Sequence, residues 1–421
     1  MSAQEMLNTS GGWRPPQPLP MKIANTILGP VAKAVDLSPE GLMTTARRST
    51  GLEHFGWLDV ERPLGRLCEA LEAEGRLTLV GRSMMRAVLT RCLENRLVMA
   101  DWIGRHPEVL TERIERPIFV IGLPRTGSTL LQRLLAADPR ARSLRTWETF
   151  WPSPPPEEAT YGQDPRIRQT QLRMDVMNWL APGFKAIHEW RADAPEEGIG
   201  LLQNTFMNIT FPMMAPIPSY GEYLETSDQH AAYRLYREQL QFLQSRFKKG
   251  WWMLKSPVHL FALDAVLESF PDAIIVQTHR DPAQVLPSIC SYFTVFQNML
   301  TESVDPVGIG RYWLDQWAQA NERALALRED PEIDARFVDV KFDELMADPM
   351  AAIARIYQAS ERELDADALA AMQAHRRDNP RNKHGVHKYS LGEFGLDAEE
   401  VHRRFGLYEQ RFEVGAGAKA G

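Results

Sequence analysis

Residues 122–129, GLPRTGST, combine two glycines, one arginine and three hydroxyl side chains in a short segment. The apolar run 118–121 before it is typical of a strand buried on both faces, and the leucines after it recur at helical spacing. A loop between a strand and a helix N-terminus binds anions, because its amide groups converge on one point and the helix dipole reinforces them. The segment therefore predicts a site for a phosphate-like or sulfate-like ligand.

The spacing of this segment is close to that of the P-loop, GxxxxGK[ST], which binds nucleoside triphosphates. Both glycines and the last hydroxyl fit the pattern, but Ser128 stands where the P-loop has its lysine, and Arg125 supplies a cation from inside the loop. An ATPase or GTPase would lose its central cation by that exchange. The pattern favours a related anionic donor that needs no metal clamp. An ATP-dependent small-molecule kinase on the same scaffold remains the alternative enzyme.

Other polar residues follow further apolar runs in the chain. The runs that predict strands are residues 251–256, 273–280 and 336–342. Strands that alternate with helices predict a mainly parallel α/β sheet, in which ligands lie beyond the carboxyl ends of the strands. Because Thr126, Lys255 and Arg280 lie at or just beyond such ends, we expect one site. Taken singly, Lys255 could end a strand in solvent, and Arg280 could pair with Asp281.

The regions outside this core predict helices and loops. Leucines and methionines at helical spacing in residues 58–109 predict two or three helices. We expect an N-terminal arm and helical region, 1–110, followed by a domain, 111–421, with a C-terminal basic segment and helix. The aromatic-rich segment 179–223 could line an apolar pocket or fill the core. Residues 22–35 could form an amphipathic helix that touches lipid, but Gly29 and Pro30 interrupt it, which favours packing on the body.

Composition limits the classes of partner. With 48 basic and 55 acidic residues, a net charge of −7 gives no general attraction to nucleic acid or to an anionic membrane. The three cysteines have no metal-ligand spacing, which favours a reducing compartment and no structural zinc. The N-terminus lacks the pattern of a secretory signal, and no run of 18 apolar residues occurs. We expect a cytoplasmic protein without a nucleic-acid partner or membrane contact; the oligomeric state stays open.

Two motifs carry a resemblance to a known family. The segment GLPRTGSTLLQRLLAADP resembles the 5′-phosphosulfate loop of sulfotransferases that use 3′-phosphoadenosine-5′-phosphosulfate (PAPS). The segment RDPAQVLPSICSY resembles the 3′-phosphate motif of that family, in which an arginine at a strand end and a serine eight residues later hold the phosphate. In this chain these residues are Arg280 and Ser288.

Two further motifs follow in the order of the family. The segment VKFDELMADP resembles the strand-to-helix pattern VxYEDLxxDP, with Phe342 in place of the tyrosine. The segment LKSPVHL resembles the lysine-containing strand end of the bacterial and tyrosylprotein branches. Together the four motifs cover roughly residues 116–350, and ordered matches of this kind are much more specific than one glycine-rich loop.

The resemblance implies a P-loop-like three-layer α/β fold with an N-terminal helical appendage. It implies that a sulfuryl group moves from PAPS to a hydroxyl or amine of a small acceptor, which could be apolar, without a metal. Lys255 would lie near the bridging oxygen. Residues expected at the 5′-phosphosulfate are Arg125, Thr126, Gly127, Ser128 and Thr129. By analogy with a basic segment that closes over the 3′-phosphate in other sulfotransferases, Arg381, Lys383 and Gly385 are expected there. A non-catalytic nucleotide-binding scaffold protein remains the alternative.

An acceptor hydroxyl or amine also needs a general base. Glu148 is the first candidate, because the tyrosylprotein branch has a glutamate at the matching place after the loop helix. His259 is the second. Many cytosolic members have a histidine two residues after the strand-end lysine, where this chain has Pro257. The remaining candidates are His188, Glu189 and Glu196. Each of these side chains could instead be a solvated or capping group.

Overall fold

The computed structural model describes residues 18–180, 191–378 and 390–415. Its centre is a five-stranded sheet with the order β2-β3-β1-β4-β5, in which every neighbouring pair is parallel. The strands are β1 (Ile118–Gly122), β2 (Ala141–Ser143), β3 (Trp251–Lys255), β4 (Ile274–His279) and β5 (Phe337–Lys341). The parallel α/β prediction is confirmed. Strand β2 was not predicted, because it is three residues long and has Arg142 at its centre.

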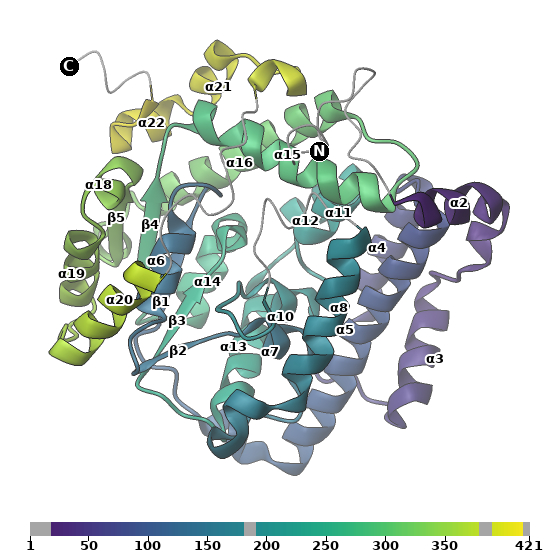
Figure 1. The fold of residues 1–421 in the computed structure, drawn as a ribbon, viewed down its shortest axis with the longest axis horizontal. Coiled ribbons are helices and arrows are strands. Elements are labelled where there is room, and N and C mark those ends of the chain that lie inside the picture. Colours follow the sequence, from purple (N-terminus) through teal and green to yellow (C-terminus); the bar gives the residue numbers. More distant parts are fainter. Residues whose placement is uncertain (1–17, 181–190, 379–389, 416–421) are drawn as a thin grey trace.

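The sheet is covered on both faces, as the continuous apolar run of its central strand β1 requires. Successive residues of β1 alternate between two hydrophobic clusters: Ile118 and Val120 belong to one, and Phe119 and Ile121 to the other. The first cluster packs under α6 (Ser128–Leu135), α18 (Phe342–Ala347), α19 (Pro349–Ala359) and α20 (Ala366–Asp378). Figure 1 shows these helices on one side of the strands and the larger helical layer on the other. This is the expected three-layer arrangement.

The larger layer holds most of the remaining helices. Between β2 and β3 they are α7 (Thr146–Phe150), α8 (Pro165–Leu180), α10 (Ile199–Gln203), α11 (Thr210–Met214), α12 (Pro218–Thr226) and α13 (His230–Gln244), with the 3-10 helix η3 (Glu158–Gln163). After β3 come η4 (Pro257–Ala262), α14 (Leu263–Ser269), α15 (Pro282–Leu300), α16 (Pro306–Leu327) and α17 (Pro331–Asp334). At the C-terminal end are η5 (Leu391–Phe394), α21 (Ala398–Arg404) and α22 (Gly406–Phe412).

The N-terminal region is helical, as predicted. Its elements are α2 (Leu19–Ile27), η1 (Gly29–Ala34), α3 (Pro39–Thr50), α4 (Glu61–Ala73), α5 (Leu79–Arg105) and η2 (Pro107–Thr111). Thr78 caps α5 by accepting a hydrogen bond from Gly81 N, and its own backbone N donates to Leu300 O at the end of α15. A Cβ on Gly81 would lie 1.8 Å from the same carbonyl oxygen, so α5 and α15 meet at a glycine. The N-terminal helices thus share one core with the sheet.

Candidate functional site

The β1–α6 loop needs glycine at both ends. Gly122 has φ 124° and Gly127 has φ 89°, which is the left-handed region that side chains disfavour. A Cβ would lie 2.5 Å from Thr278 O at Gly122 and 2.7 Å from Leu345 Cδ2 at Gly127. The loop is therefore packed tightly between β4 and α18. It delivers the first turn of α6, whose initial N–H groups have no partners within the helix, to the carboxyl edge of the sheet.

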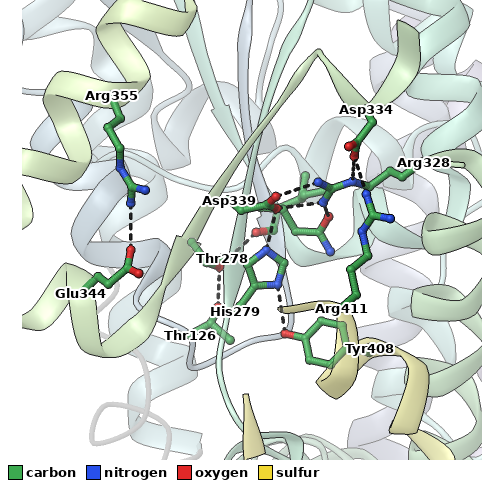
Figure 2. Close-up of polar contacts among 12 residues, drawn as sticks. Thr126, Thr278, His279, Arg328, Asp334, Asp339, Glu344, Arg355, Tyr408 and Arg411 are labelled. Atoms are coloured by element: carbon green, nitrogen blue, oxygen red, sulfur yellow. Dashed lines mark hydrogen bonds and ion pairs between the residues drawn. The ribbon is translucent and has the colours of Figure 1, made fainter. Parts of the chain in front are cut away.

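The hydroxyls of this loop have different surroundings. Thr126 is fully buried; its Oγ1 donates to Leu123 O at 2.6 Å and contacts Thr278 Oγ1, which in turn donates to Ile121 O at 3.1 Å (Figure 2). This side chain fastens the loop to β4, so only its backbone amide is left to face a ligand. Ser128 is buried at the start of α6, whereas Thr129 is exposed.

Two arginines meet beside the loop. Arg280 follows β4 and donates from its Nη1 to Arg125 O at 3.1 Å, and its guanidinium lies 3.9 Å from the ring centroid of Phe342. Burial and the nearby Arg125 cation lower the pKa of Arg280, against the opposing charges of Asp343 and Asp281. Asp281 caps α15 by accepting from Ala283 N at 2.8 Å. A positive potential therefore concentrates where β1 and β4 end.

An ion-pair cluster around the buried side chains of Arg328 and His279 holds the strand end that presents Arg280. Arg328 donates two hydrogen bonds to Asp339 of β5, at 2.8 and 2.7 Å, and His279 Nε2 contacts the same carboxylate at 2.8 Å (Figure 2). The hydrogen bonds from Arg328 and His279 hold the pKa of Asp339 far below its usual value despite burial. The other ring nitrogen of His279 contacts Tyr408 Oη of α22 at 3.3 Å. The C-terminal helix is thereby joined to the residue preceding Arg280.

A third cation comes from β3, the strand that pairs with β1 on the side opposite β4. Lys255 ends β3 with a side chain 7% exposed, and its Nζ forms an ion pair with Glu197. Ser256 Oγ donates to the other oxygen of that carboxylate at 3.2 Å, and Gly198 N donates to Lys255 O at 3.4 Å. Burial, and secondarily the charges of Glu197 and Glu196, raise the pKa of Tyr292 of α15. The position of Glu197 next to Lys255 was not predicted from the sequence.

The comparisons with known proteins agree on one family. A model of the sulfotransferase family matches residues 117–366, which is more than half of the chain. The chain belongs to the sulfotransferase family. The matched range begins one residue before β1 and ends at the start of α20, so it contains all five strands of the sheet. The P-loop-like fold predicted from the motifs is confirmed.

Solved sulfotransferases resemble the structure over most of its length. The crystal structure of STF1 from Mycobacterium tuberculosis H37Rv is 34% identical and has a TM-score of 0.78, covering 88% of this chain and 98% of its own. STF9 from Mycobacterium avium is 29% identical with a TM-score of 0.82, covering 90% and 98%. A curated relative, omega-hydroxy-beta-dihydromenaquinone-9 sulfotransferase Stf3 of Mycobacterium tuberculosis, is 28% identical over 58% of this chain. The match spans only 62% of the length of that relative.

Glu148 does not join the cations of this sulfotransferase. Its side chain is fully buried in α7 and forms an ion pair with Arg142 of β2. It also accepts hydrogen bonds from Tyr161 Oη at 3.0 Å and from Arg145 N at 2.8 Å. With these donors around it and no exposed surface, the carboxylate binds two segments of the protein together. This geometry does not favour its prediction as the base.

His259 is also enclosed. Its ring is fully buried, its Nδ1 lies 2.9 Å from Tyr233 Oη, and it packs against Phe119 with a centroid distance of 5.1 Å. Burial, and secondarily the Lys255 cation, lower the pKa of His259 to about 3. The ring is therefore neutral at pH 7, and in this enclosure no acceptor can reach it.

Glu196, another predicted candidate for the base, has both carboxylate oxygens in hydrogen bonds. They accept from Thr146 Oγ1 at 3.4 Å and from Glu197 N at 2.9 Å.

The remaining predicted residues have mixed outcomes. Ser288 is half-buried on the second turn of α15, on the helix that begins after Arg280. Arg381, Lys383, Gly385, His188 and Glu189 lie outside the described residues. In the described part of segment 179–223, Phe206, Phe211 and Tyr220 are fully buried, which supports the core interpretation for those side chains. Among the described residues, no helix is long and apolar enough to cross a membrane.

Proposed function

We propose that this sulfotransferase uses PAPS as its donor and transfers the sulfuryl group to a hydroxyl of a lipid-like acceptor. The observation that carries the proposal is the meeting of three cationic positions at one sheet edge: Arg125 after β1, Lys255 at the end of β3 and Arg280 after β4. An extended nucleotide with phosphate groups at both ends of its ribose needs several separated cations. One triphosphate in a standard P-loop relies on a single lysine.

Each cation has a part in the transfer. Arg125 and the amides of residues 126–129 would hold the 5′-phosphosulfate, and Arg280 with Ser288 would hold the 3′-phosphate. Sulfuryl transfer resembles phosphoryl transfer, in which the transition state is loose and charge develops on the leaving oxygen. Lys255 would stabilise that oxygen as the bond to sulfur breaks. Fixed positive charge in a site with little water is the main source of rate in such reactions.

Glu197 is the carboxylate best placed to take the proton of the acceptor. It contacts Lys255, and its side chain is 14% exposed. Without donor, the carboxylate neutralises the buried lysine. When the donor binds, the leaving oxygen becomes an alternative partner for Lys255 Nζ, which frees a carboxylate oxygen of Glu197 for the acceptor hydroxyl. The sulfur–oxygen bond to the acceptor then forms as the proton passes to Glu197.

The acceptor class rests on the curated relative, whose name gives an omega-hydroxylated menaquinone derivative as its substrate. A hydroxyl at the end of a long apolar chain is chemically suited to the base and donor arrangement proposed here. The proposal therefore extends to a hydroxylated lipid and not to a particular quinone.

Calorimetry with 3′,5′-adenosine bisphosphate and, in parallel, with magnesium ATP tests the donor. We expect the bisphosphate to bind, and Arg280→Ala to weaken it at least about ten-fold, which is ~1.4 kcal/mol. Arg355→Ala is the matched control, because Arg355 pairs with Glu344 on an exposed surface. Tight binding of ATP without binding of the bisphosphate would contradict the proposal and favour a kinase.

Turnover is tested next with labelled PAPS and a series of hydroxylated lipids, with and without EDTA. We expect labelled product in both conditions, since the donor site is built from arginine, lysine and backbone groups. If the bisphosphate binds but no acceptor is sulfated, the protein is a nucleotide-binding scaffold and the transferase proposal is wrong.

A further inference from the structure

The first described helices present a row of large apolar side chains to solvent. Leu19, Ile23, Ile27, Leu28 and Val31 are between 47% and 69% exposed. The first three are four residues apart on α2 and so lie on one face; Leu28 joins α2 to η1, and Val31 lies on η1. We call these five residues the apolar stripe. They are five of the twelve exposed large hydrophobic side chains among the described residues.

The outward direction of the stripe is fixed by packing on the opposite face of the helix. Met21 is 2% exposed and belongs to the main core. Asn25 Oδ1 accepts a hydrogen bond from Val80 N of α5 at 3.2 Å, and Ala32 is buried on η1. Figure 1 shows α2 at the outer edge of the molecule. The sequence favoured packing of this segment on the body, and the structure confirms this for one face only.

The charged residues within the segment that carries the stripe have one sign; the next charged residue along the chain, Asp36, pairs with Arg86 of α5. Residues 19–34 contain Lys22 and Lys33 and no acidic residue, and both lysines are exposed. The whole chain carries a net charge of −7. This short segment is therefore a local positive area on an acidic protein, and an apolar face flanked by lysines is the pattern of helices that lie in a membrane interface.

We propose that the apolar stripe docks the protein on an anionic lipid bilayer, with the stripe in the acyl–headgroup boundary and Lys22 and Lys33 at the headgroups. A second copy of the chain is a poorer occupant. Two acidic protomers repel each other, and a stable pair buries about 800 Å² per partner, more than two turns of helix supply. The expectation of no membrane contact rested on the charge of the whole chain and on Gly29 and Pro30, which interrupt residues 22–35 and favoured packing of that segment on the body.

Docking also gives the proposed acceptor a source. A hydroxylated lipid resides in a bilayer, so an enzyme held at the bilayer surface can reach it without the lipid leaving the bilayer for water. This source of the acceptor depends on the proposed function, whereas the docking itself depends on the stripe and its lysines and can be measured without turnover.

Vesicle flotation of the full chain tests the proposal. The probes are vesicles of phosphatidylcholine alone and of phosphatidylcholine with phosphatidylglycerol. We expect the full chain to bind the anionic vesicles, and the double variant Ile23→Ser/Ile27→Ser to bind them at least about ten-fold more weakly. Leu407→Ser is the matched control, because Leu407 is as exposed as Ile27 but lies on α22. Lys22→Gln/Lys33→Gln should weaken binding to the anionic vesicles more than to the neutral ones.

Two readouts separate failure of docking from failure of the fold or of the chemistry. The double variant Ile23→Ser/Ile27→Ser should keep the thermal midpoint and the bisphosphate affinity of the wild type. Equal flotation of the wild type and the double variant, or no flotation of the wild type, would overturn the proposal even if the enzyme sulfates lipids in detergent. A third outcome would also overturn the proposal: the wild type sediments as a dimer and does not bind vesicles, whereas Ile23→Ser/Ile27→Ser sediments as a monomer. That result would show that the stripe joins two copies of the chain.

Discussion

Two of the buried carboxylate–cation pairs among the described residues differ in how completely they are enclosed. The pair of Arg142 and Glu148 is 2% and 0% exposed, with additional donors on the carboxylate. The rings of Trp252, Phe247 and Tyr161 surround the guanidinium at 4.8–5.1 Å. The pair of Lys255 and Glu197 lies at a strand end, with the carboxylate 14% exposed.

The difference separates a structural pair from one that can react. A carboxylate with all its acceptor sites filled by protein donors cannot take up a proton from a substrate without unfolding part of the structure. A lysine paired with one partially exposed carboxylate can exchange that partner for an anion that enters the site. Burial alone therefore does not identify a catalytic group; the availability of an alternative partner does.

The largest expected effect is on the pair of Lys255 and Glu197. Glu197→Gln keeps the shape and a hydrogen-bond acceptor for Lys255 but removes the base, so kcat should fall by about 10²–10⁴-fold. Steady-state assays with labelled PAPS measure this. Glu196→Gln is the control, because Glu196 precedes it in the chain and should change kcat far less. A Glu197→Gln enzyme with wild-type kcat would remove the distinction between the pairs.

Glu148→Gln should instead act on stability. Removing the charge leaves Arg142 buried without its counter-ion, which typically costs about 3–5 kcal/mol. Chemical denaturation gives the free energy of unfolding, and Glu344→Gln is the control, because its pair with Arg355 is about half exposed and worth at most about 1 kcal/mol. Below the melting transition, the folded variant should keep its turnover number. Loss of turnover without loss of stability would return Glu148 to the site as the base.

The smallest expected effect concerns His259 and pH. Its folded-state pKa of about 3 lies below the usual 6.5. The unfolded chain therefore binds a proton below pH 6.5 that the folded protein does not. The stability from the neutral ring is complete above pH 6.5 and is lost as the pH falls toward 3. Between pH 8 and 5 the loss should be about 2 kcal/mol in the wild type and absent from His259→Gln, as measured by denaturation at both pH values. Equal losses in both proteins would mean that the ring is accessible.

Much of the sheet could be predicted from the sequence because strands buried on both faces require continuous apolar runs. The runs at 118–121, 251–254 and 273–276 meet this requirement, and parallel topology then brings the ends of the three strands together. Strand β2 could not be found in this way, because its central Arg142 is buried through an ion pair and ring contacts and not through apolar character.

Side-chain partners were the part that the sequence could not supply. Glu148, Glu196 and Glu197 are equally plausible carboxylates by residue type, and only tertiary packing shows that one closes on Arg142 and another on Lys255. The acidic segment ADAPEEGIG was a usable signal for Glu197, but choosing between its adjacent glutamates requires the direction of each side chain. Whether residues 22–35 bury their apolar face likewise depends on what the neighbouring helices leave uncovered.

Helix α15 connects the proposed donor site at Arg280 to the region of α5 that holds α2. It begins two residues after Arg280 and ends at Leu300, where it meets Thr78 and Gly81, next to the Val80 amide that holds α2. Its 19 residues span about 28 Å. If α2 rests on a bilayer, this helix acts as a spacer that sets how high above the lipid the sulfuryl group is delivered. Acceptors would then be selected by how far their hydroxyl can rise from the membrane as well as by their chemistry.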